Sequence, residues 1–238
     1  MTLKMETVER LISTMRSVFT TWTRKLVKGE RVKASISDGN HKIGRAMNVS
    51  FAPILSCGNC EHCMCTCYAV KNLVRRGITV INAWVKNWAL FCFNRDEFFR
   101  QIREKMARRK KNKFLRWHVS GDIVDRDHFE RMNSTAVDFP DFREWTYTEM
   151  HHIVNSFCDD NGRDAIPENF NVMFSDWSLI TGVAINNPYH FKRFIVVPKN
   201  TPEDALPKGF YCPGNCDFCK EHKCGCIYGK SDVYCKEH

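Results

Sequence analysis

Hydrophobic residues near the start of the chain recur every three or four positions, which is the spacing of an amphipathic helix. This run covers residues 5–27, and its apolar positions are Val8, Leu11, Ile12, Met15, Val18, Phe19, Trp22 and Leu26. Gly29 follows as a stop signal. Two short strand-like segments, about 32–36 and 42–51, lie on either side of the turn signal Asp38-Gly39.

A second series of helical patterns follows the residues around Pro53. One helix is expected from Tyr68 to about Arg75, and Gly77 interrupts it. A longer helix comes next, with one apolar side made of Ile81, Trp84, Val85, Trp88 and Phe91. A further helix begins near Asp96. We interpret the aromatic residues of these helices as core packing.

From residue 114 onward, short apolar strands alternate with helical segments. The expected strands are 114–119, 142–148, 170–174 and 193–197, and the expected helices are 127–137 and 149–157. This alternation is typical of parallel βα units with right-handed crossovers. The units are too few for a full eight-fold TIM barrel. The sequence therefore predicts an α/β fold: a partial or open (β/α) barrel-like parallel sheet, preceded by an N-terminal helix.

The length fits a single domain over residues 1–238. We divide it into the N-terminal helix and short strands (1–55), a first cysteine loop (56–68), the βα units (69–200) and a C-terminal cysteine-rich segment (205–238). The 43% hydrophobic content indicates a packed globule. No apolar run is long enough to span a bilayer, and no secretory leader is recognisable, so we expect a cytoplasmic protein.

Ten of the thirteen cysteines gather in two groups. The first group is Cys57, Cys60, Cys63, Cys65 and Cys67, and the second is Cys212, Cys216, Cys219, Cys224 and Cys226. Disulfides have geometric demands that neighbouring loop positions rarely meet, whereas thiolates this close in sequence can converge on one metal centre. In a reducing cytoplasm, clustered thiols are metal ligands before they are disulfides. We therefore predict that both groups are cysteine-rich metal-binding loops.

The number and spacing of these thiols favour iron–sulfur clusters over zinc. A zinc ion needs only four ligands. Cys57, Cys60 and Cys63 have the C-x2-C-x2-C spacing that opens many cluster-binding runs. Gly58, Gly214 and Gly225 allow the backbone to wrap closely. The prediction is one or more iron–sulfur clusters of the [4Fe–4S] type, with zinc as the alternative; two clusters, or one cluster and a zinc ion, both fit ten thiols.

Polar residues follow the predicted strands, where parallel α/β folds carry their ligand sites. They are Ser120-Gly121-Asp122, Thr146-Tyr147-Thr148 and Ser175-Asp176. We predict that His118, Ser120, Asp122 and Ser175 face a bound molecule and have catalytic roles. Helix capping is an equal explanation for Ser and Asp, and a hydrogen-bonded core residue is the alternative for His118. We expect both cysteine groups at this same rim of the sheet.

Three further cysteines and two histidines need separate interpretations. Cys92 and Cys158 lie in apolar helical patterns, so we interpret them as packing residues. For Cys235 two interpretations are left open: it is a spare ligand or a surface thiol. His62 and His222 are not required as ligands, because each has several thiols nearby.

The net charge of +9 is concentrated in one segment. Residues 95–116 hold ten basic residues against three acidic ones. Such a stripe is most simply the solvated end of a helix, and it is alternatively a contact surface for nucleic acid phosphates.

The second cysteine group resembles a known cluster motif. Cys212-x3-Cys216-x2-Cys219, with Phe218 before its last cysteine, is similar to the motif of radical S-adenosylmethionine enzymes, which use a partial (β/α) barrel and leave one iron open to the cofactor. In that family the motif follows the first strand, whereas here it comes late in the chain. Cys224 and Cys226 are near enough to fill the open position, and only Ser120-Gly121-Asp122 loosely corresponds to a Gly-Gly-Glu segment.

A different resemblance covers about 180 residues. The chain resembles the cysteine-rich gene product 88 family of bacteriophages in Cys67-Tyr68-Ala69, in residues 116–123 and in Tyr147-Thr148. Cys212-Pro213-Gly214-Asn215-Cys216-x2-Cys219 and the final His238 also fit. This resemblance implies a phage or prophage origin, a bacterial host cytoplasm and an iron–sulfur protein, but no known reaction.

Three functional hypotheses follow. The first is an iron–sulfur protein that serves redox chemistry with a redox partner or activates a small molecule. The second is a nucleic-acid-binding module with structural metal sites, which contacts phosphate through residues 95–116. The third is a zinc-stabilised scaffold without chemistry.

Overall fold

The computed structural model describes residues 3–58 and 63–237 of the chain, so Cys60 and His62 lie outside the described residues. The chain divides into two compact units. The first contains Met1–Ser37, Asn48–Lys111 and His118–Asp122, and the second contains Asp38–Met47, Asn112–Trp117 and Ile123–His238. The single domain over 1–238 stays a prediction.

The first unit is built mainly from helices. They are α1 (Met5–Val27), α2 (Tyr68–Arg76), α3 (Ile78–Phe93) and α4 (Arg95–Arg108). The bounds predicted for α1 and α2 and the start predicted for α4 agree within one residue. The two short strands around Asp38-Gly39 are shorter than the predicted segments 32–36 and 42–51: they are β1 (Ile36–Ser37) and β2 (Met47–Val49), which pair antiparallel. The positive φ of 75° at Gly29 is consistent with the predicted stop of α1.

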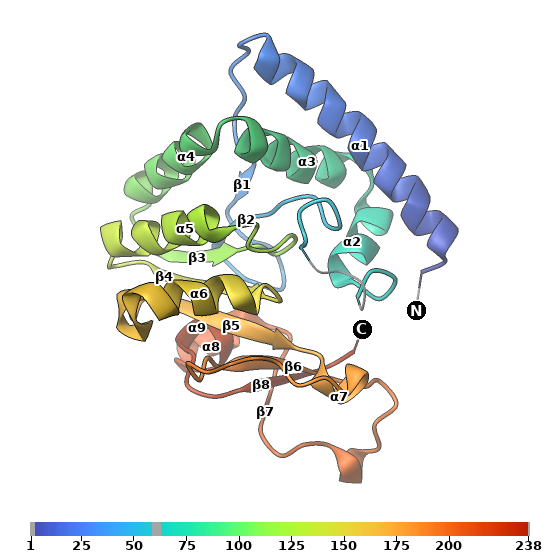
Figure 1. Cartoon of the computed structure of the whole chain (residues 1–238), viewed down its shortest axis with the longest axis vertical. Coiled ribbons are helices and arrows are strands. Elements are labelled where there is room, and N and C mark those ends of the chain that lie inside the picture. Colours follow the sequence, from blue (N-terminus) through green and yellow to red (C-terminus); the bar gives the residue numbers. More distant parts are fainter. Residues whose placement is uncertain (1–2, 59–62, 238) are drawn as a thin grey trace. The chain divides into compact units, whose positions relative to one another are not determined.

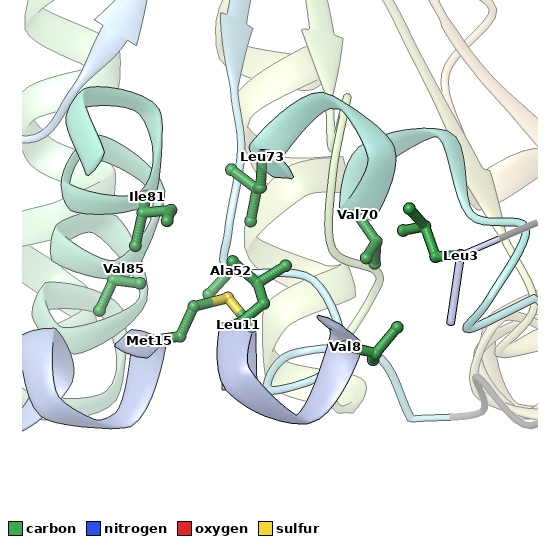
Figure 2. Packing of buried hydrophobic residues seen from close by; sticks show 9 residues of the cluster. All are labelled: Leu3, Val8, Leu11, Met15, Ala52, Val70, Leu73, Ile81 and Val85. Atoms are coloured by element: carbon green, nitrogen blue, oxygen red, sulfur yellow. The ribbon is translucent and has the colours of Figure 1, made fainter. Parts of the chain in front are cut away.

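An apolar cluster holds α1, α2 and α3 together (Figure 2). Val8, Leu11 and Met15 come from one side of α1 and face residues of the other two helices. Its members are Leu3, Val8, Leu11, Met15, Ala52, Val70, Leu73, Ile81 and Val85, all of them buried. The three- and four-residue spacing in the sequence thus corresponds to a real buried stripe. Among the described helices, none is both long and apolar enough to cross a bilayer.

The second unit contains a parallel sheet. Its strands are β3 (Phe114–Trp117), β4 (Arg143–Thr148), β5 (Phe170–Asp176), β6 (Arg193–Val197), β7 (Phe210–Tyr211) and β8 (Val233–Lys236). They lie in the order β3-β4-β5-β6-β8-β7, and every neighbouring pair is parallel. The predicted α/β class with an open, mostly parallel sheet is confirmed.

Helices connect these strands. They are α5 (Arg126–Asp138), α6 (His151–Asn161), α7 (Ser178–Thr181), α8 (Cys216–Glu221) and α9 (Gly225–Tyr228), with short 3-10 turns at Arg163–Ala165 and Glu203–Ala205. Two of them, α5 and α6, correspond to the expected helices 127–137 and 149–157. The side chain of Asp125 accepts a hydrogen bond from the His128 amide and so caps the start of α5.

Alternation along the strands gives the sheet two different faces. One face carries Phe170 and Phe174 of β5, and it packs against α5 and α6 through ring contacts of Phe129 and His151. The other face carries Phe114 and Arg116 of β3, Trp145 and Tyr147 of β4 and Met173 and Ser175 of β5, as the strand registers require. We call this second face the cysteine face, because α9 packs on β4 and β5 from that side (Figure 1).

Three details of the predicted strands were wrong. The segment 193–197 is not the last strand, because β7 and β8 follow it. The strand at 114–119 ends at Trp117, since His118 has a positive φ of 53°. Ser175 and Asp176 belong to β5 itself and not to the loop after it. β7 and β8 are too short to show an alternating pattern in the sequence, and they form through pairing with neighbouring strands.

A pair of neighbouring residues in α2 tests the packing of the first unit. Leu73 is 1% exposed in the apolar cluster, whereas Val74 is 44% exposed. Leu73→Ala should lower the free energy of unfolding by about 2–5 kcal/mol, because it leaves a cavity. Val74→Ala should change it by less than about 0.5 kcal/mol. Urea denaturation followed by circular dichroism measures both, and equal effects would contradict this packing.

Candidate metal centres

The described part of the first cysteine group forms a tight loop that leads into α2. The Thr66 amide donates to the Cys63 carbonyl over 2.9 Å, and the Leu3 amide donates to the Cys65 carbonyl over 3.0 Å. Cys67 is the residue that precedes α2, and its carbonyl accepts from the Lys71 amide. The predicted place of Cys67 just before a helix is confirmed.

The position of Cys67 favours its thiolate form. A hydrogen bond with the Cys63 side chain is the largest influence, and the amides of Val70 and Ala69 at the start of α2 add to it. These contacts outweigh burial and lower the pKa of Cys67 to about 6. A thiolate is the form that binds metals. Cys67 thus favours the thiolate form in the protein without any metal.

The loop Ser120-Gly121-Asp122 lies against the beginning of the first cysteine group, within the first unit. The Phe51 amide donates to the Ser120 carbonyl over 2.9 Å. A Cβ atom at Gly121 would lie 2.7 Å from Oγ of Ser56, the residue before Cys57. Gly121 also has a φ of 88°, so close approach and backbone conformation both require glycine here.

Three of the four predicted catalytic residues therefore share the first unit with the first group. His118 and Asp122 are buried, and the His118 amide donates to the Val49 carbonyl over 2.9 Å. The buried Ser120 hydroxyl has no hydrogen-bond partner among the described residues. Ser175 instead lies in β5 of the second unit, on the cysteine face. Their catalytic roles stay predictions.

The second cysteine group lies between β7 and β8 and occupies α8, α9 and their connections. The Cys212 amide donates to the Tyr234 carbonyl of β8 over 2.8 Å, so the group starts at the carboxyl end of β7. Tyr228, at the end of α9, stacks under the guanidinium of Arg143, the first residue of β4. The group thus extends across the cysteine face. That both groups lie at one rim of the sheet stays a prediction.

Close contacts hold this group against the strands. The Asn171 side chain of β5 donates a hydrogen bond to the Cys226 carbonyl. A hydrogen bond joins the Tyr147 hydroxyl and the Cys226 thiol. The Asn215 side chain accepts from the Asp217 amide and caps α8. A Cβ atom at Gly225 would lie 2.9 Å from Sγ of Cys219, so glycine is needed where the chain passes this thiol.

Burial and mutual proximity raise the pKa of three thiols of the second group. Burial raises the pKa of Cys219 to about 12, and the charge of Cys224 and a hydrogen bond with it also contribute. Burial likewise raises the pKa of Cys226 and of Cys216. Cys212 acts electrostatically on all three of these thiols. Interactions of this kind place the five thiols of the group in one neighbourhood.

Cys235 belongs with the second group rather than with the surface thiols. It lies in β8 on the cysteine face, and it is partly buried. Burial raises the pKa of Cys235, and the charge of Cys212 contributes. Cys158 is buried, as a packing residue should be, but Cys92 is exposed on α3, so its interpretation as core packing was wrong. The spacing of apolar residues alone did not show which side of α3 is buried and which is exposed.

The thiols are neighbours without forming a finished coordination site. No disulfide forms among the described cysteines. In residues 3–58 and 63–237, no three His, Cys, Asp or Glu side chains converge closely enough to hold a metal ion. Coordination would require the thiols to turn toward one another, which is expected when metal binding and folding are coupled.

The residues that surround the second group did not stand out in the sequence. Arg116 is part of the basic stripe 95–116, but its strand position puts it on the cysteine face. Its guanidinium carbon lies 4.8 Å from the ring centre of Tyr147. Trp145 is fully buried on the same face. Strand alternation in Phe114-Leu115-Arg116-Trp117 is the signal that could have revealed an arginine on an apolar sheet face.

Comparison with known proteins defines the class of this chain: it belongs to the gene product 88 family, whose profile matches residues 21–207. The match includes the first cysteine group and ends before Cys212, so the second group lies outside it. No curated protein and no solved structure is significantly similar to the chain.

The low pKa of Cys67 leads to a prediction about thiol reactivity. In chelator-treated protein, the rate of alkylation of Cys67 by iodoacetamide should rise with pH around a midpoint near 6. Cys63→Ser should move that midpoint upward, because a hydroxyl replaces the thiol that influences Cys67 most. Mass spectrometry of modified peptides measures the rates, and circular dichroism checks that the fold persists. A midpoint above 8 for Cys67 in the unmutated chain would contradict the assignment.

Proposed function

We propose that this chain is an iron–sulfur protein of the gene product 88 family, with a cluster held by the second cysteine group on the cysteine face of the parallel sheet. One observation carries the proposal. The five cysteines of the second group are close in sequence, and their thiols also interact electrostatically with one another. They are partly buried against β4 and β5. Buried thiols that raise one another's pKa are costly to leave as isolated anions, and a metal centre removes that cost.

The number of thiols is what favours a cluster over a single zinc ion. Cys212, Cys216, Cys219, Cys224 and Cys226 exceed the four ligands that zinc uses, and Cys235 lies nearby. Four of them would hold a [4Fe–4S] cluster, which supplies one-electron redox chemistry when bound. The first group, with the prepared thiolate of Cys67, would hold a second centre.

The contribution of the protein around the cluster is burial and hydrogen bonding. The Tyr147 hydroxyl donates to the Cys226 sulfur and fixes its orientation. Ser175 lies on the same face and is a candidate contact for a small molecule or redox partner. His118, Ser120 and Asp122 would have the corresponding place beside the first group. Cofactor-linked radical chemistry has no support beyond the motif resemblance, and we do not propose it.

The nucleic-acid hypothesis is less favoured by the contacts of α4. Arg100 pairs with Glu97 and Glu104, and Arg108 also pairs with Glu104. The Lys105 ammonium donates to the Ile36 carbonyl over 2.7 Å. These cations are engaged within the first unit, and Arg116 lies on the sheet. Phosphate binding through 95–116 stays a prediction; Arg100, Arg108, Lys110 and Lys111 are the exposed basic residues of this segment.

Metal analysis of anaerobically purified protein tests the proposal directly. The protein should be brown, and it should contain iron and acid-labile sulfide in similar amounts. Expression in medium with adequate iron provides the control. Stoichiometric zinc without sulfide would overturn the iron–sulfur assignment and favour the structural zinc scaffold.

Serine substitutions separate ligands from packing residues. Cys216→Ser and Cys219→Ser should each remove most of the iron from the second centre, because serine replaces a thiolate with a weaker donor. Cys158→Ser is the matched control: it also replaces a buried thiol of the second unit, but α6 holds it on the opposite face. Iron per chain and visible absorbance are the readouts. Iron loss in the Cys158 variant, with iron retained in the other two, would show that the ligand assignment is wrong.

A further inference from the structure

Arg116 has an unusual position for an arginine. It is the third residue of β3 and pairs in register with Trp145 of β4, so both side chains point to the cysteine face. Its neighbours in β3, Leu115 and Trp117, are fully buried on the other face. The guanidinium lies over the ring of Tyr147, 4.8 Å from its centre, which is a cation–π arrangement.

The charge of Arg116 has no carboxylate partner in the described chain. Its Nε atom is buried and has no hydrogen-bond acceptor among the described residues. The Nε1 atom of Trp145, beside it, is equally buried and equally unpaired. Buried donors without acceptors cost free energy, so two on the same face indicate a missing acceptor group.

The second cysteine group covers the same sheet face as this arginine: α9 packs on β4 and β5, and Asn171, in register with Trp145, donates a hydrogen bond to the Cys226 carbonyl. Arg116 acts electrostatically on Cys216 and Cys226, and on Tyr147 between them. Lys220 also acts on Cys216, but its ammonium already binds the Asp217 carboxylate and the Ile43 carbonyl. Arg116 therefore differs from Lys220, because no carboxylate of the described residues pairs with its guanidinium.

We propose that Arg116 is the counter-ion of an anionic thiolate-ligated centre in the second cysteine group, and that Arg116 and Trp145 donate hydrogen bonds to its sulfur atoms. This inference rests on the proposed function and adds a positioning role for residues outside the cysteines. A cluster with four thiolate ligands carries net negative charge, and sulfur accepts hydrogen bonds from buried donors. The loaded centre would supply the acceptors that both donors lack.

The proposal has two measurable consequences. Residues that support metal ligands from the outer shell typically change metal affinity about 10- to 100-fold when they are replaced. A nearby positive charge also stabilises the more negative, reduced cluster, so its removal lowers the reduction potential. A purely structural role for Arg116 would leave the potential of the remaining loaded protein unchanged.

The test compares four anaerobically purified full-length proteins: the unmutated chain, Arg116→Gln, Arg116→Lys and Arg143→Gln. Arg143→Gln is the matched control, since Arg143 lies on the same sheet face and also stacks on a tyrosine, but its partners are Tyr228 and the Glu168 carbonyl. Iron and sulfide per chain are measured after a chelator challenge, and midpoint potentials by dithionite titration. Arg116→Gln should lose iron about 10- to 100-fold more readily and have a lower potential. Arg116→Lys should stay close to the unmutated chain.

The outcomes separate the two proposals. Equal iron retention and equal potential in Arg116→Gln and Arg143→Gln would overturn the role of Arg116 while leaving the iron–sulfur assignment intact. Zinc in place of iron in the unmutated chain would overturn that assignment, and the role of Arg116 would then be decided by zinc retention in the same variants. If Arg116→Gln does not fold, Trp145→Phe decides: it keeps an aromatic ring, removes one donor, and should lower the potential. An unchanged potential in that variant would overturn the donor role.

Discussion

The alternation of side chains along the parallel strands β3, β4 and β5 is the constraint on which the second unit depends. Each strand sends one set of residues toward α5 and α6 and the other set toward the cysteine face. Because the pairing is parallel and in register, Arg116, Trp145 and Asn171 lie beside one another across neighbouring strands. The same register puts Tyr147 where its hydroxyl reaches Cys226. A shift of one residue in β3 would turn Arg116 toward the helices.

The two cysteine groups differ in the direction in which the protein shifts the pKa of their thiols. Cys67 is surrounded by hydrogen-bond donors at the start of a helix, and these lower its pKa. In the second group, burial raises the pKa of Cys216, Cys219 and Cys226. In the proposed cluster site, metal binding would displace protons from thiols whose pKa is raised, and the positive charge of Arg116 would favour that displacement.

Membership of the gene product 88 family gives the chain a class but no reaction. The matched residues 21–207 contain the first group and most of the sheet, whereas the second group and β8 lie beyond them. The structure joins these parts, because β8 lies between β6 and β7. The C-terminal segment is thus built into the sheet of the second unit.

Local pattern was enough to determine several elements of this protein. The amphipathic spacing of residues 5–27 and the apolar run 193–197 predict α1 and β6 with their observed bounds, because each signal comes from residues that are neighbours in the chain. The grouping of the cysteines was equally readable. The sequence did not reveal β7 and β8, because strands of two and four residues are too short to show an alternating pattern and form through pairing with other strands. The contact of Gly121 with Ser56 and the place of Arg116 among the thiols were also decided by tertiary structure, since each depends on residues that only folding brings together.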